Sequence, residues 1–232
     1  MSLSARLILD LVMLGLFLAS FAWRFTGNTV HEIGGFLLLA AAILHNGLNR
    51  RWYRAIPQGR HRPVRRVLTA VDLGLLIATA AVMTSGLTNS RLLGRLTGAE
   101  WEILSRQFHS AAAHWVLLFA ALHLGLHLRL FAGAFRKHAG IDLDRGGALI
   151  ATRVSAAALS AFGLHAFADR SIAARLTATV SFDYWDPSFP VAWFLLEYVA
   201  LIAAGAIVAH YGRAAVRRAE GWAGRIADET TT

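Results

Sequence analysis

Long apolar runs constrain the fold of this chain more than any other feature. A helix needs about 20 apolar residues to cross a hydrocarbon core roughly 30 Å thick. The hydrocarbon offers no hydrogen-bond partners to the backbone, so such runs must form helices. We expect membrane-spanning helices at residues 7–23, 30–48, 67–87, 108–131, 148–167 and 190–211. The sequence therefore predicts an all-α, polytopic membrane protein with six transmembrane helices.

Composition supports a membrane protein and excludes several kinds of site. The 232 residues are 56% hydrophobic, with a mean hydropathy of +0.49. Cysteine is absent, which excludes disulfides, iron–sulfur clusters and covalent attachment of haem through Cys-x-x-Cys-His. The net charge is +9, and basic loops of a membrane protein account for such an excess without nucleic-acid binding.

The distribution of arginine and lysine predicts the orientation. If both termini are cytoplasmic, six of the 23 basic residues lie on the outer side. These are Arg24, Arg91, Arg95, Arg106, Arg170 and Arg175. The others lie inside, as the positive-inside rule requires. We therefore expect a multi-pass protein of the bacterial inner membrane with both termini in the cytoplasm.

Two histidine pairs with the same spacing indicate a cofactor site. His31 and His45 lie fourteen positions apart, and so do His109 and His123. On an α-helix this spacing places both rings on one face, about 21 Å apart along the axis. Two parallel helices could thus hold two stacked haems, with one imidazole from each helix on each iron. His127 shares that face and could replace His123, bond a propionate or relay protons.

Other polar and small residues within the predicted helices are further candidates. Gly34 and Gly35 follow His31 by about one turn and would let a macrocycle approach the backbone. Glu197 is an acid inside an apolar helix; it could pair with Arg170 or act at a quinone or proton site. His165 could line an outer cavity or lie at the membrane interface.

Two local predictions concern acidic residues near helix ends. Thr29 and Glu32 have the spacing of a capping box at the start of the second helix. Asp10 and Asp72 lie near the inner interface, where we expect them to reach the headgroup region or pair with loop arginines.

Several motifs resemble those of a bacterial family of integral membrane proteins of unassigned function. They are Leu44-His45…Leu48-Asn49-Arg50…Trp52-Tyr53, His109…Trp115, His123-Leu-Gly-Leu-His127 and Phe182-Asp183…Pro187. That family has four core helices and is similar to the cytochrome b561-like and ferric-reductase-like di-haem proteins. This chain departs from the expected pattern at Asn46 and His114. The resemblance implies two b haems held by His31, His45, His109 and His123, and transmembrane electron transfer.

The predicted organisation is a haem bundle with two flanking helices. Residues 1–132 would form the four-helix di-haem core, 133–212 the flanking helices with an outer aromatic loop, and 213–232 a cytoplasmic tail. The sequence contains no Gly-x-Gly-x-x-Gly dinucleotide motif. We therefore expect electrons from a membrane quinol or a partner protein.

The partner and the chemistry stay open at this point. The acid-free segment between Arg50 and Arg66 suits an acidic flavodoxin- or ferredoxin-like carrier, or anionic lipid. One alternative is a redox reaction of quinol, superoxide or a ferric or cupric chelate at the outer haem, beneath Phe182–Pro187. A second is a transporter whose histidines bind transition metals directly. A third is a membrane anchor for a redox subunit, which is compatible with the haem hypothesis.

Overall fold

The structure, a computed structural model, describes residues 3–58, 62–97, 103–140, 146–179 and 186–229. These residues form ten helices and no strand, which confirms the predicted all-α fold. The long helices are α1 (Leu3–Phe21), α3 (Asn28–Leu48), α5 (Pro63–Asn89), α7 (Ile103–Ala139), α8 (Gly146–Asp169) and α10 (Val191–Glu229). The short helices are α2 (Trp23–Thr26), α4 (Arg50–Ala55), α6 (Arg91–Thr97) and α9 (Ile172–Leu176).

Five of the described helices, α3, α5, α7, α8 and α10, are long and apolar enough to cross a membrane. They carry large apolar side chains on their outer surfaces. Ile43 is 66% exposed, Ile77 68%, Leu164 71% and Val208 67%. An apolar surface of this extent is typical of helices that face lipid. The chain is therefore a multi-pass membrane protein, and a sixth span at α1 stays a prediction.

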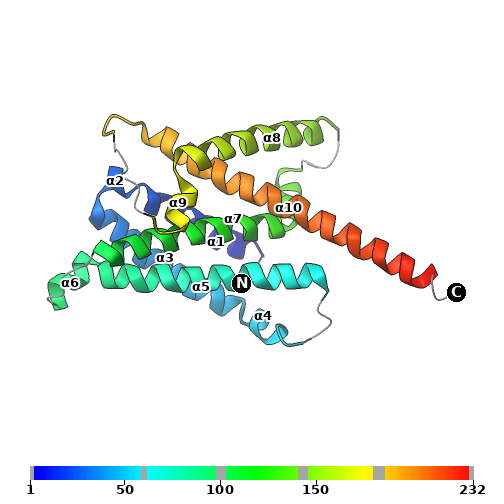
Figure 1. Cartoon of the computed structure of the whole chain (residues 1–232), viewed down its shortest axis with the longest axis horizontal. Helices are drawn as coiled ribbons and strands as arrows, with labels where there is room; N and C mark the ends of the chain where they lie inside the picture. Colours follow the sequence, from blue (N-terminus) through cyan, green and yellow to red (C-terminus); the bar gives the residue numbers. More distant parts are fainter. Residues whose placement is uncertain (1–2, 59–61, 98–102, 141–145, 180–185, 230–232) are drawn as a thin grey trace.

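The long helices pack as neighbouring pairs. α1 lies along α3, α5 lies along α7, and α10 packs against both α7 and α8 (Figure 1). α2 and α6 lie at one end of the bundle, together with the start of α3, and we call it the His31 end. α4 lies at the opposite end, which we call the His45 end.

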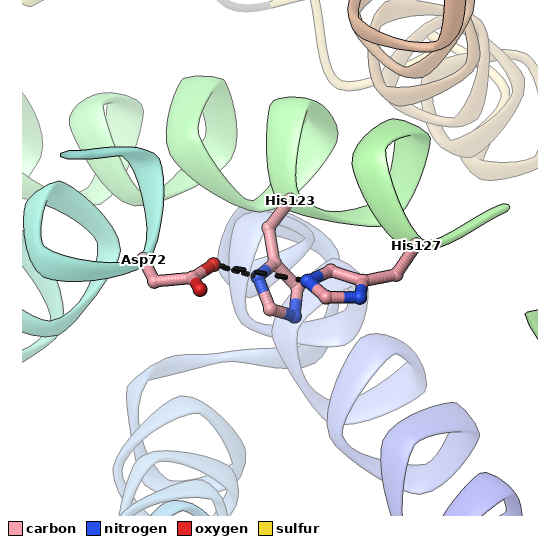
Figure 2. A group of neighbouring side chains, drawn as sticks. All are labelled: Asp72, His123 and His127. Atoms are coloured by element: carbon pink, nitrogen blue, oxygen red, sulfur yellow. Dashed lines mark hydrogen bonds and ion pairs between the residues drawn. The ribbon is translucent and has the colours of Figure 1, made fainter. Parts of the chain in front are cut away.

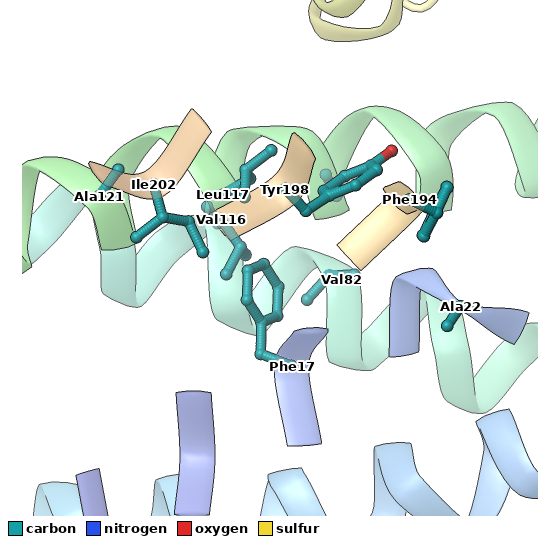
Figure 3. Close-up of a cluster of buried hydrophobic side chains, with 11 residues drawn as sticks. Phe17, Ala22, Val82, Val116, Leu117, Ala121, Phe194, Tyr198 and Ile202 are labelled. Carbon is teal, nitrogen blue, oxygen red and sulfur yellow. The ribbon is translucent and has the colours of Figure 1, made fainter. Parts of the chain in front are cut away.

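A buried apolar cluster joins α1, α5, α7 and α10 (Figure 3). Phe17 of α1 faces Val82 of α5 and Val116 of α7, and α10 contributes Tyr198 and Ile202. The Phe21 ring lies 4.6 Å from that of Tyr198, between ring centroids. This cluster fixes α1 against the α5–α7 pair on one side of the bundle.

Small residues bring α10 close to α7 and α8. A Cβ atom at Gly125 would overlap the backbone of Ala206, and one at Gly163 would overlap the backbone of Ala200. Close contacts between small residues are the usual packing of helices within membranes. Gly125 therefore serves the packing of α7 on α10.

Glu32 does not form the predicted capping box with Thr29. α3 begins before Thr29, and its N-cap makes no side-chain hydrogen bond. The Glu32 carboxylate instead accepts hydrogen bonds from the amides of Arg91 and Leu92, at 2.9 and 3.0 Å, and from the Ser90 hydroxyl, at 2.7 Å. These free donors at the start of α6 compete for the same carboxylate. Glu32 thus connects α3 to the corner between α5 and α6.

Several helices extend beyond the predicted boundaries. α5 begins at Pro63, and the amide of Val64 donates to Oε1 of Glu220 on α10 at 2.9 Å. α7 continues to Ala139, just before Gly140, whose φ is +68°. α10 continues to Glu229 through a polar segment rich in alanine and arginine, which are good helix formers. Polarity ends the membrane span but does not end the helix.

Candidate functional site

A cavity of about 1120 Å³ opens between the α1–α3 pair and the α5–α7 pair. Typical ligand sites enclose about 300–1,000 Å³, so this cavity can hold a large ligand or more than one. Five of the predicted site histidines line it: His31, His45, His109, His123 and His127. The fourteen-residue spacing thus brings both histidine pairs to one cavity.

At the His31 end, one histidine from α3 meets one from α7. The ring centroids of His31 and His109 lie 6.0 Å apart, and the ring planes are 84° from parallel. A single metal ion bound by two opposed imidazoles needs a centroid distance of roughly 6 Å, because each metal–nitrogen bond is about 2 Å and each ring nitrogen lies about 1 Å from its centroid. The separation of this pair therefore matches the one that a bridging iron requires.

The hydrogen bonds of this pair determine which ring nitrogen is free. Nδ1 of His31 lies 2.9 Å from the carbonyl oxygen of Ser20, which can only accept, so Nδ1 carries the proton. Nδ1 of His109 lies 3.1 Å from the Ser85 hydroxyl. That hydroxyl also lies 2.8 Å from the carbonyl of Ala81, to which it donates, so it accepts from His109. Both histidines therefore keep Nε2 as a lone-pair donor for a metal.

Glycines make room beside these rings. A Cβ atom at Gly86 would lie 3.2 Å from Cε1 of His109. Gly35 lines the cavity, and nothing lies within 4 Å of the Cβ that it lacks. The neighbouring Gly34 faces Ser20 of α1, with the Ser20 hydroxyl 4.0 Å from its Cβ position. Gly35 and Gly86 thus open the site, whereas Gly34 faces α1.

At the His45 end, the histidines are held by carboxylates. Nδ1 of His45 donates to Asp10 of α1 at 2.8 Å, and Nδ1 of His123 donates to Asp72 of α5 at 2.7 Å. Metal-binding histidines commonly use a carboxylate or carbonyl on the other ring nitrogen in this way. The expectation that Asp10 and Asp72 pair with loop arginines is wrong, because their carboxylates bind histidines of neighbouring helices. Their reach to the headgroup region stays a prediction.

His127 lies beside His123 rather than in its place (Figure 2). The two ring centroids are 4.6 Å apart. Nε2 of His127 lies 3.9 Å from Oδ1 of Asp72, beyond hydrogen-bond distance. The donor atoms of Asp72, His123 and His127 all lie within 4.8 Å of one another, so these residues could also hold a metal ion directly. His123 has Nδ1 occupied and Nε2 free, which favours it over His127 as a haem ligand.

The two helix pairs divide their roles in the same way. In each pair the second helix carries two of the proposed ligands, and the first helix carries the groups that accept their Nδ1 protons. Ser20 and Asp10 accept hydrogen bonds from the histidines of α3. Ser85 and Asp72 accept them from the histidines of α7. The site is thus built twice from one pattern, once on each side of the cavity.

Polar side chains line both ends of the cavity. At the His31 end these include Arg24, Arg91 and Arg106. At the His45 end, Arg6 donates to Oδ1 of Asn49 at 3.3 Å. There, the Tyr53 hydroxyl donates to Asn46, which stands where the resemblance leads us to expect a histidine. Both ends can therefore offer hydrogen-bond donors to the carboxylates of a ligand.

The remaining candidates lie apart from the paired histidines. Glu197 is 2% exposed and accepts from Nε of Arg170 at 2.6 Å, so the predicted pairing is present. Arg170 lines the cavity, and its guanidinium lies over the Phe189 ring at 4.7 Å. His165 is exposed on α8, away from the cavity. Glu197 and Arg170 therefore form a buried ion pair with each other and are not candidate cofactor ligands.

His114 and the outer aromatic segment are the remaining features that the sequence singled out. His114 is buried, lies 5.3 Å from the Phe21 ring and donates Nδ1–H to the carbonyl of Ser110 at 2.7 Å. It thus packs within the bundle. Most of the aromatic segment, from Phe182 to Trp185, lies outside the described residues.

Comparison of the chain with protein-family models, curated proteins and solved structures finds no match. The resemblance to di-haem cytochromes therefore stays a prediction. The conclusion that the described residues support is a multi-pass helical membrane protein whose central cavity is lined by two levels of oriented histidines.

Proposed function

We propose that this protein binds two b haems within the membrane and passes electrons from one side to the other. One observation carries the proposal. Four histidines at two levels line one cavity, and each has Nδ1 held by an acceptor from a neighbouring helix. A packed histidine such as His114 also has a hydrogen-bonded Nδ1. The repeated use of Nδ1 by four histidines of one cavity, which leaves their Nε2 atoms to a metal, is what favours a ligand role.

The separation of His31 and His109 fits one iron, and His45 and His123 line the same cavity at its other end. His31 and His109 would hold one iron, and His45 and His123 the other, each through Nε2. Haem, when bound, supplies a one-electron couple. The Nδ1 partners fix the orientation of the ligand rings. The missing side chain of Gly35 leaves space beside the backbone for a macrocycle. Arginines at the His31 end, and Arg6 at the His45 end, would offset the charge of propionates.

The proposed orientation places the His45 end in the cytoplasm of a bacterial cell. α4 follows α3 at that end, and its Arg50, Arg51 and Arg54 are exposed. Under the positive-inside rule such a loop is cytoplasmic, and so are both termini. α1 would be the sixth span, because it lies along α3 and exposes Ile8 and Leu11.

The exposed arginines of α4 also support a proposed partner. An acidic carrier of the flavodoxin or ferredoxin class would be attracted to this end of the protein. A quinol in the membrane is the other proposed donor, and anionic lipid would compete for the same arginines.

The test of this function is to remove the ligands one level at a time. His31→Ala should remove one haem and leave the other, and His45→Ala should do the reverse. His165→Ala is the matched control, because that histidine is exposed and lies away from the cavity. Haem content and the low-spin spectrum are measured on the purified variants. If single changes at either level leave both haems bound, the assignment of ligands is refuted.

A second candidate function rests on the cluster of Asp72, His123 and His127. One carboxylate and two imidazoles within 4.8 Å can bind Zn²⁺ or Cu²⁺ without haem. The protein would then be a transition-metal transporter or metal-binding membrane protein. Metal analysis separates the two candidates. Iron in haem supports the first, and stoichiometric zinc or copper without haem supports the second.

A further inference from the structure

The two levels of histidines differ in the charge of the groups that hold them. At the His45 end, Asp10 and Asp72 accept the Nδ1 protons of His45 and His123 at 2.8 and 2.7 Å. At the His31 end, the acceptors are a backbone carbonyl and a serine hydroxyl, at 2.9 and 3.1 Å. Each imidazole at the His45 end thus has an anionic partner, whereas those at the His31 end have neutral partners.

This difference has a direct consequence for an iron bound at each level. A carboxylate that accepts from Nδ1 makes the imidazole a stronger electron donor through Nε2. It also adds negative charge near the metal, which favours the ferric over the ferrous state. At the His31 end, Arg24, Arg91 and Arg106 line the cavity with one carboxylate, Glu32, so these groups carry net positive charge. At the His45 end, Arg6 offsets only one of the two carboxylates. Positive charge near a metal favours the reduced state.

We propose that Asp10 and Asp72 are positioning residues that make the His45 level the lower-potential one of the two. The proposal rests on the function proposed above and adds the direction in which electrons are transferred. One electron would pass from the His45 level to the His31 level, one iron losing the electron that the other gains. With the His45 end in the cytoplasm, electrons leave the cell interior.

The test is a potentiometric titration of the haem-loaded protein, followed optically. The unmodified protein should titrate in two one-electron waves. Asp10→Asn and Asp72→Asn keep an acceptor oxygen at the same reach and remove only the charge. Each should raise the midpoint potential of the lower-potential wave and leave that of the higher-potential wave unchanged. The expected shift is a change of about tenfold in the reduced-to-oxidised ratio at fixed potential, equal to about 59 mV for one electron.

Three comparisons make the result specific. Asp186→Asn is the matched control, because Asp186 is an exposed carboxylate outside the helices, bonded to Ser188. Asp72→Glu restores the charge and should restore the lower wave. His31→Ala should leave only the lower wave, which assigns it to the His45 level. Electron paramagnetic resonance spectra of the low-spin ferric haems should change at only one of the two haems in the asparagine variants.

The outcomes separate the inference from the function on which it rests. Two haems with a lower wave that neither asparagine variant moves would overturn the inference and leave the function standing. A rise in the midpoint potential of the higher-potential wave, with the lower one unchanged, would also overturn the inference. A protein that binds no haem under loading conditions refutes the proposed function itself.

Discussion

Gly86 provides a test in which fold stability and cofactor binding should move in opposite directions. A Cβ atom at this position would lie 3.2 Å from Cε1 and 3.6 Å from Nδ1 of His109. Comfortable contacts between carbon atoms are about 3.5–4.0 Å, so alanine would push the ring away by a few tenths of an ångström. The bond from Nδ1 to Ser85 is already 3.1 Å long and would weaken.

The magnitudes for Gly86→Ala follow from these distances. Replacing glycine by alanine inside a helix stabilises the helix by about 1 kcal/mol. Disturbing a group that orients a metal ligand costs about tenfold in affinity, roughly 1.4 kcal/mol. We therefore expect a thermal midpoint that is unchanged or higher, together with weaker haem binding at the His31 level. Gly86→Val adds two methyl groups at the same place and should abolish binding at that level.

The assay combines haem content per chain with the rate of haem transfer to excess apomyoglobin. Gly15→Ala is the matched control, because Gly15 is an exposed glycine of α1 with nothing within 4 Å of its Cβ position. It gains the same helix propensity and should keep both haems. If Gly86→Val retains two haems with unchanged transfer rates, the proposed role of His109 is wrong.

Three further predictions concern the surroundings of the cavity. His127→Ala should leave both haems bound, since His123 is the proposed ligand; loss of the haem at the His45 level would make His127 the ligand instead. Arg170→Ala should destabilise the fold by about 3–5 kcal/mol, because Glu197 would be left as an unpaired buried charge; replacing both residues with leucine should recover most of this in thermal unfolding, and no recovery would contradict the ion-pair account. Gly163→Val should lower the thermal midpoint through overlap with the backbone of Ala200 and leave the haem spectrum unchanged; a midpoint equal to the parent's would refute the close packing of α8 on α10.

The parts of the fold that follow from backbone chemistry could be predicted from the sequence. An apolar run in lipid must be helical, so the long helices appear near their predicted positions. The periodicity of a single helix predicts that His31 and His45 share one face of α3, and that His109 and His123 share one face of α7.

The groups that hold the histidines could not be predicted, because they depend on which helices lie side by side. Asp10 is 35 residues from His45, and Asp72 is 51 residues from His123. Spacing on one helix says nothing about either pair. Glu32 shows the same limit, since a free helix start 59 residues away competes for its carboxylate. Ser85 could have been singled out from the sequence as a candidate partner of a histidine, because it is a polar residue inside an apolar run.

The measurement that tests the central claim most directly is the haem content of the purified protein, produced with an adequate haem supply. A pyridine haemochrome assay should give two b haems per chain, and the reduced-minus-oxidised spectrum should be that of six-coordinate, low-spin iron. A protein without a Soret band, or one that carries zinc or copper at Asp72, His123 and His127 in place of haem, would contradict the account.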